Sequence, residues 1–115
     1  MAELKGAERR LHERKPLRGT AQLVFPSQPP LEVRTWDISA GGIAIIASAN
    51  PPPKLRCVIR FVVPLLTGGG TPVEVKVQVA HSVLSSNHGA FMVGLQFEGL
   101  SAAGEQAVAR FLKGQ

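Results

Sequence analysis

Several residue types are scarce in this sequence of 115 residues, and each scarcity excludes a class of protein. Cys57 is its one cysteine, so the chain forms no internal disulfide. No apolar run approaches the roughly 18 residues that a membrane-spanning helix needs, and the N-terminus is charged where a signal peptide would be apolar. These absences predict a cytoplasmic protein that does not insert into a membrane.

The sequence motifs of common enzymes are also missing. There is no G-x-S-x-G, H-E-x-x-H or C-x-x-C, and no pair of carboxylates near a histidine that indicates acid/base chemistry. The run Gly68-Gly69-Gly70 lacks the lysine and the following hydroxyl residue of a phosphate-binding P-loop. Cys57 alternates in phase with Ile59 and Phe61, which indicates a buried structural thiol. We therefore expect neither catalysis nor a cofactor.

Alternation of apolar and polar residues recurs in six segments, which is typical of strands with one buried face. Turn-forming residues separate these segments, and we expect strands over residues 19–25, 31–37, 43–47, 55–63, 73–84 and 90–97. Gly94 inside the last segment indicates a bulge or a close approach by another group. Ser101 can cap a helix that has Gly104, Val108, Phe111 and Leu112 on one face. Short links and a terminal helix predict an antiparallel barrel or sandwich.

Positive charge is concentrated at the N-terminus. Residues 1–18 contain six basic and three acidic residues, a net +3 of the chain's total of +5. They offer few apolar anchors, and Pro16 disfavours helix in the residue before it. We therefore divide the chain into a flexible basic arm, residues 1–18, and a β-barrel with a C-terminal helix, residues 19–115. A positive arm attracts an anion such as a phosphate, a nucleic acid or a membrane face.

Two short motifs carry polar groups that suit a nucleotide. Arg10 and Arg14 form R-x-x-x-R, and Asp37, Ser39 and Gly42 form D-x-S-x-x-G between two β-prone segments. A guanidinium donates two parallel hydrogen bonds, which fits both the O6/N7 edge of guanine and a phosphate. Taken separately, each motif also has an ordinary interpretation, as a solvated basic arm and as a Ser or Asx turn with a glycine bend.

In this order and at this distance, the two motifs resemble the signature of the PilZ domain, a bacterial receptor for the second messenger cyclic di-GMP. The resemblance runs from about Glu8 to Phe111 and includes Val93-Gly94-Leu95-Gln96-Phe97, which is similar to the last strand of that family. It implies an all-β fold, a six-stranded antiparallel β-barrel with a C-terminal helix.

The resemblance also implies a binding site for cyclic di-GMP where the arm meets the turn. Arg10 and Arg14 would contact guanine and phosphate groups, and the arm would become ordered over the barrel on binding. Asp37 and Ser39 would bond the edge of the other guanine, for which Gly42 would leave room. The carboxylate of Asp37 can accept from N1 and N2 of guanine, donors that adenine lacks.

Two further residues are candidates for this site. Arg9 stands just before R-x-x-x-R, a position that in the family influences whether one ligand or a stacked pair is bound, and an arginine there favours the pair. His81 interrupts the valine-rich segment. It is either a half-buried strand histidine or a ring that stacks on a base at the surface of the sheet.

Three functions follow as hypotheses. The favoured one is a single-domain receptor that binds cyclic di-GMP and signals to an unidentified effector protein. The second is a PilZ-like scaffold that has lost ligand binding, against which the intact set of motif residues argues. The third is a basic barrel that binds RNA or single-stranded DNA. Such proteins usually offer stacking aromatics, and this chain has no tyrosine, one tryptophan and five phenylalanines.

Overall fold

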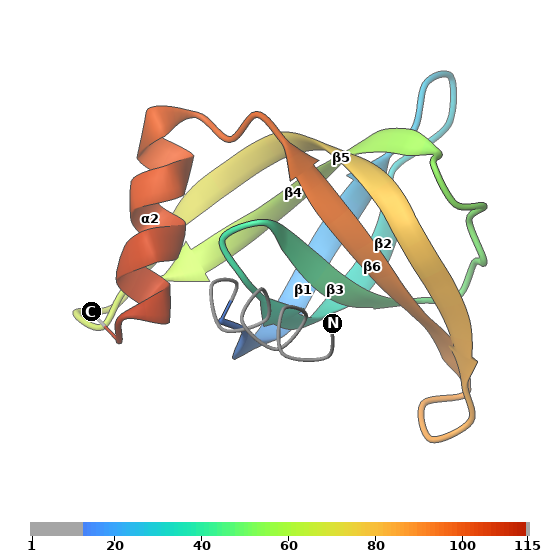
Figure 1. Cartoon of the computed structure of the whole chain (residues 1–115), viewed down its shortest axis with the longest axis horizontal. Coiled ribbons are helices and arrows are strands. Elements are labelled where there is room, and N and C mark those ends of the chain that lie inside the picture. The colour runs from blue at the N-terminus through green and yellow to red at the C-terminus, as the bar shows by residue number, and fades with distance from the viewer. Residues whose placement is uncertain (1–12, 115) are drawn as a thin grey trace, which may run out of the picture.

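A computed structural model describes residues 13–114 of the chain, and it confirms the predicted six-stranded antiparallel β-barrel with a helix after the last strand (Figure 1). The alternating segments of the sequence become strands because each has one apolar face to bury. The elements are β1 (Lys15–Val24), β2 (Leu31–Ile38), β3 (Gly42–Ala47), β4 (Arg56–Pro64), β5 (Gly70–Ser85), β6 (Ala90–Glu98) and α2 (Ala102–Leu112).

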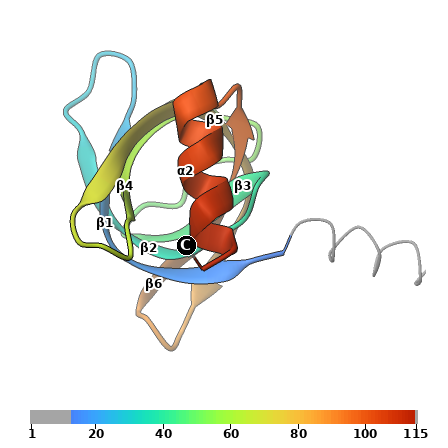
Figure 2. The ribbon, with the colours of Figure 1, turned by 90° about the vertical axis from the view of Figure 1, so that its left-hand side faces the viewer.

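The strands close into a ring in the order β1-β2-β3-β6-β5-β4. All neighbouring strands are antiparallel, and β1 and β2 form a hairpin. A short ladder between β1 and β4, in which Leu23 pairs with Ile59, closes the ring. Figure 2 shows the ring of strands with α2 across one end of it. Closure leaves no open sheet edge along the barrel.

The core is formed by the inward residues of the alternating strands. In β4 these are Cys57, Ile59 and Phe61, as the sequence predicts, together with Val63. Burial raises the pKa of the Cys57 thiol, because the thiolate form is poorly solvated inside the barrel. Cys57 is therefore a structural residue of the core. In β5 the inward residues are Val73, Val75, Val77 and Val79.

The helix α2 is fixed at both of its ends. The hydroxyl of Ser101 accepts a hydrogen bond from the backbone N–H of Gly104 at 3.0 Å, which confirms the predicted N-cap. The buried residues Gly104, Ala107 and Val108 face the barrel. At the other end, Lys15 Nζ donates to the carbonyl oxygen of Phe111 at 2.9 Å, and it also lies 4.7 Å from the centre of the Phe111 ring. The start of β1 thus holds the end of α2.

The first strand begins earlier than the sequence predicts. Lys15–Arg18, assigned above to the flexible arm, belong to β1, where Lys15 pairs with Ile38 and Pro16 with Asp37 of β2. Pro16 is tolerated because it lies at the beginning of the strand, and Leu17 is buried in the core. Residues 1–12 of the predicted arm lie outside the described residues. Within residues 13–114, no helix is long and apolar enough to cross a membrane.

Candidate functional site

A β-bulge in β2 orients the acidic end of the D-x-S-x-x-G motif. Thr35 pairs with Ile45 and Asp37 with Ala44, so Trp36 is an extra residue with no partner on β3. Thr35 and Ile38 are buried in the barrel, whereas Trp36 and Asp37 are half-buried and both line the same outer pocket. The bulge therefore turns two consecutive side chains outward, which simple strand alternation does not allow.

A second bulge, in β5, has the same effect on the opposite side of the pocket. Val79 pairs with Leu95 and His81 with Gly94, so Ala80 is the extra residue. Ala80 and His81 are both exposed and line the pocket. The half-buried interpretation of His81 is wrong, because the bulge directs its side chain outward.

Small residues form the floor between the two bulges. The register of the sheet places Asp37, Ala44, Gly94 and His81 in one row across β2, β3, β6 and β5. The imidazole of His81 lies against Gly94, where a Cβ atom would collide with the ring. This confirms the predicted close approach at Gly94. The arrangement is a shallow trough with a wall on β2 and another on β5.

The turn after β2 is held by Ser39. Its buried hydroxyl oxygen accepts hydrogen bonds from the N–H groups of Gly41 and Gly42, each at 3.2 Å. The N–H of Ser39 donates to the carbonyl of Gly42 at 2.8 Å. A Cβ atom at Gly42 would collide with the carbonyl oxygen of Leu95, so this glycine lets β3 lie close to β6. The turn is thus fixed by its own backbone before any ligand is considered.

Arg14 connects the two sequence motifs. Its Nε and Nη2 atoms donate to Oδ1 of Asp37 at 2.8 and 2.6 Å, and Nη1 lies 3.5 Å from the hydroxyl oxygen of Ser39. The Arg14 side chain is 46% exposed and that of Asp37 is 26% exposed. An ion pair this accessible contributes only about 0–1 kcal/mol to stability. A ligand can therefore compete for both partners.

One pocket collects the predicted site residues that the structure describes. Its volume is about 590 Å³, and its lining includes Arg14, Asp37, Ser39, Gly42 and His81. Pockets of this size hold small ligands and cofactors. Arg9 and Arg10, the other two predicted residues, lie outside the described residues.

Trp36 is a pocket residue that the sequence analysis missed. The carbon of the Arg18 guanidinium lies 3.6 Å from the centre of its ring, and Arg18 Nε donates to the Trp36 carbonyl at 2.9 Å. The ring of His88, in the β5–β6 turn, meets the indole edge-on with centroids 4.8 Å apart. The position of Trp36 directly before Asp37 of the motif is the sequence signal that could have identified it as a candidate.

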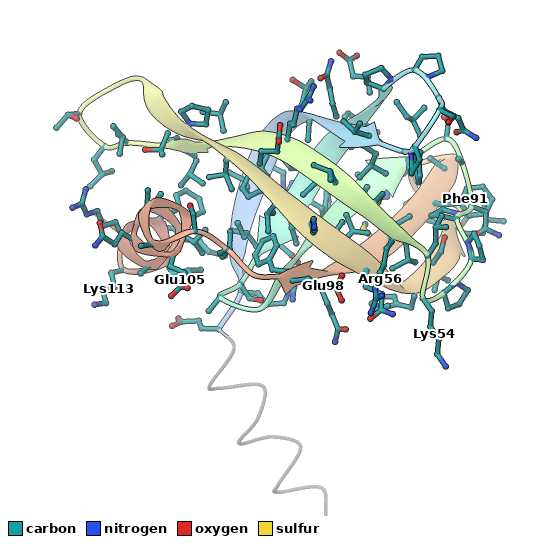
Figure 3. The ribbon with its side chains drawn as sticks, turned by 90° about the horizontal axis from the view of Figure 1, so that it is seen from above. Lys54, Arg56, Phe91, Glu98, Glu105 and Lys113 are labelled. Atoms are coloured by element: carbon teal, nitrogen blue, oxygen red, sulfur yellow. The ribbon has the colours of Figure 1, made fainter. Side chains whose placement is uncertain are left out.

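A second hollow lies beside α2 and has a different character. Its volume is about 560 Å³, and its lining includes the apolar residues Phe97, Leu100 and Val108. Glu105 and Lys113, on one side of α2 in Figure 3, also border it. This hollow is lined by none of the predicted site residues that the structure describes, so we do not assign the motif site to it. Within residues 13–114, no cluster of three or more histidine, cysteine or acidic side chains could hold a metal ion.

Comparisons with known proteins show the family and the fold of the chain. Residues 8–114 match the family model described as the PilZ domain. No curated protein matches the sequence. Among solved structures, the inhibitor of motility MotI/DgrA of Bacillus subtilis superposes with a TM-score of 0.78 at 16% identity, covering 89% of this chain and 48% of that one.

Two further structures with this fold are of proteins with c-di-GMP. The PilZ domain of YcgR from Escherichia coli with c-di-GMP gives a TM-score of 0.66 at 17% identity, covering 92% of this chain and 90% of that one. The MrkH–c-di-GMP complex of K. pneumonia gives 0.68 at 14% identity, covering 89% and 50%. The chain spans about half the length of MotI/DgrA and of MrkH. At these identities the likeness shows a shared fold.

Proposed function

Because the chain belongs to the PilZ domain family, we propose that it is a cyclic di-GMP receptor whose ligand occupies the pocket between β2 and β5. One observation carries this proposal. Arg14, the last residue of R-x-x-x-R, donates to Asp37 and approaches Ser39 of D-x-S-x-x-G, so the two halves of the signature meet at one pocket. YcgR and MrkH, which share the fold, are described as complexes with c-di-GMP.

The charges in the pocket favour a ligand that offers both acceptors and donors. Arg14 and Asp37 bind one another in the structure. A ligand that separates them has to replace each partner, since a charged group left unpaired is unfavourable. A phosphate or the O6/N7 edge of guanine accepts from Arg14, and N1 and N2 of guanine donate to Asp37. Cyclic di-GMP supplies all of these groups, whereas cyclic di-AMP lacks the donors for Asp37.

The remaining predicted residues complete the proposed site. His81 presents an exposed ring on the β5 wall, which suits stacking on a base. Arg9 and Arg10 precede Arg14 in the sequence and would close over the ligand as the arm becomes ordered. Charge-assisted hydrogen bonds offset the loss of chain entropy in that step. The ordered arm then offers a changed surface to an effector protein, and Arg9 favours a stacked pair of ligands.

Calorimetric titration with cyclic di-GMP, GTP and cyclic di-AMP tests the proposal. We expect selective binding of cyclic di-GMP, weakened about tenfold to a hundredfold in Arg14→Ala, because charged hydrogen bonds of ~1.5–3 kcal/mol are lost. Arg60→Ala is the matched control. Arg60 forms a similarly exposed pair with Glu74, Nε to Oε1 at 2.7 Å, on β4 and β5 away from the pocket lining.

The possible results separate the receptor from the other two functions. Selective binding that falls in Arg14→Ala and not in Arg60→Ala supports the receptor. An equal loss in both variants would mean that the ligand responds to net charge alone. A folded protein that releases no heat with any of the three nucleotides contradicts the receptor and leaves the scaffold and the nucleic-acid-binding functions.

A further inference from the structure

We infer that Trp36 is the base-stacking wall of the pocket, on whose indole a purine of the bound nucleotide packs. The inference rests on the proposed function and adds to it a residue outside both motifs. Trp36 follows the buried Val33 and Thr35 and lies on the outer face of β2, and the bulge brings the next residue, Asp37, to the same face, so that both line the pocket. Bulges often re-aim side chains next to functional sites.

The indole is held in place on two sides without help from a ligand. The Arg18 guanidinium lies over its ring, 3.6 Å from the centroid, and is itself fixed by the 2.9 Å bond to the Trp36 carbonyl. The His88 ring meets the indole at an interplanar angle of 77°, and His88 Nδ1 lies 2.8 Å from the Ser85 hydroxyl oxygen. An aromatic surface that is already oriented loses little freedom when a ligand binds.

The place of Trp36 beside Asp37 suits recognition of a base. A planar base that donates its N1 and N2 hydrogens to the Asp37 carboxylate has its face exposed to the neighbouring side chain. Between Asp37 and His81 the row contains Ala44 and Gly94 and spans about 14 Å across the strands, and the imidazole of His81 lies over Gly94. The short side chain of Ala44 leaves room for a flat ring between the β2 wall and the imidazole of His81.

Other aromatic residues of the barrel have a different role. Phe61 and Phe97 pack in parallel with ring centroids 6.2 Å apart, as part of the core and its border. Trp36, in contrast, belongs neither to the buried core nor to the apolar residues packed against it. A large aromatic ring on the outer face of a strand, next to a pocket and clamped by an arginine, is better explained by a stacked ligand than by the core.

The composition of the chain makes this residue easy to follow. Trp36 is the single tryptophan and there is no tyrosine, so intrinsic fluorescence reports on this indole alone. We expect cyclic di-GMP to quench or shift the emission with the same Kd that calorimetry gives. Trp36→Leu should weaken binding about tenfold to a hundredfold, and Trp36→Phe less, because a phenyl ring still stacks.

Arg18 provides a test of the clamp. Arg18→Ala should weaken binding a few-fold in the native background and have no further effect in Trp36→Leu, because its role passes through the indole. Thermal melting of each variant establishes that the barrel is folded. An Arg18 effect that persists in Trp36→Leu would contradict the clamp and assign Arg18 its own contact with the ligand.

The outcomes distinguish this inference from the proposed function. If the native protein binds in calorimetry while its emission stays constant, Trp36 does not stack, even where Trp36→Leu binds less tightly. If Trp36→Leu binds as tightly as the native protein, the inference is also overturned and the receptor function stands. If the native protein does not bind cyclic di-GMP at all, the result contradicts both the stacking role of Trp36 and the receptor function.

Discussion

At the residue scale, two glycines border the pocket, and an added Cβ atom would collide with a different group at each of them. At Gly42 the obstacle is the carbonyl oxygen of Leu95, which is part of the β6 backbone. At Gly94 it is the ring of His81, an exposed side chain that can rotate away. The same small substitution therefore acts on the barrel in one case and on the pocket wall in the other.

Gly42→Ala should lower the free energy of unfolding by about 1–3 kcal/mol, because the added methyl forces β3 and β6 apart. Urea denaturation measures this as a lower midpoint at constant slope. Gly94→Ala is the matched control, and it should leave the midpoint nearly unchanged since only His81 has to move. Equal midpoints for all three proteins would show that the backbone at Gly42 accommodates a methyl without strain.

At the scale of elements, the strands could be predicted because apolar and polar residues alternate strongly in the sequence. The valines of β5 and the inward residues of β4 occupy the faces that their period indicates. The two bulges could not be predicted, since an extra residue in a strand changes the register without changing the residue types. Trp36 and Asp37 therefore both face outward, although alternation places them on opposite faces.

The two motifs predict part of the lining of the candidate site, and the two bulges determine which other side chains face it. The meeting of Arg14 with Asp37 follows from two sequence signatures that only the folded chain brings together. The wall residues Trp36 and Ala80 carry no motif, and the two bulges bring Asp37 and His81 to the same outer face beside them. The early start of β1 was missed for a similar reason, because Pro16 and the charged residues around it conceal the pairing with β2.

The link between β1 and α2 is also testable at the scale of elements. Lys15→Met keeps the apolar stem and removes the cation that binds the Phe111 carbonyl. A cation near a helix C-terminus contributes about 0.3–1 kcal/mol, so hydrogen exchange in the last turn of α2 should become about two- to fivefold faster. The exposed Lys76→Met on β5 is the control. Faster exchange throughout the barrel would contradict a local role for Lys15.

Charge is the property that concerns the whole molecule. On β4, β5 and β6 the arginines are balanced by glutamates, with Arg56 beside Glu98 at 3.3 Å (Figure 3) and Arg60 beside Glu74. Six of the thirteen basic residues fall within residues 1–18 of the sequence, a segment that includes Arg14 of the pocket lining. This uneven distribution of charge fits an anionic ligand. The salt dependence of the binding affinity then distinguishes a dinucleotide from a polymer.

Affinity for cyclic di-GMP should therefore depend only weakly on salt. The affinity of a single strand falls with a log–log slope of about 0.7 per neutralised phosphate, and cyclic di-GMP has two. A rise from 50 to 200 mM salt should thus weaken binding by at most about sevenfold. A strand held through six phosphates would lose about 300-fold over the same range. Titration with cyclic di-GMP and with a guanine-rich oligonucleotide in both buffers measures the two slopes. Tighter binding of the oligonucleotide, with the steeper slope, would make the protein a nucleic-acid-binding barrel instead of a receptor.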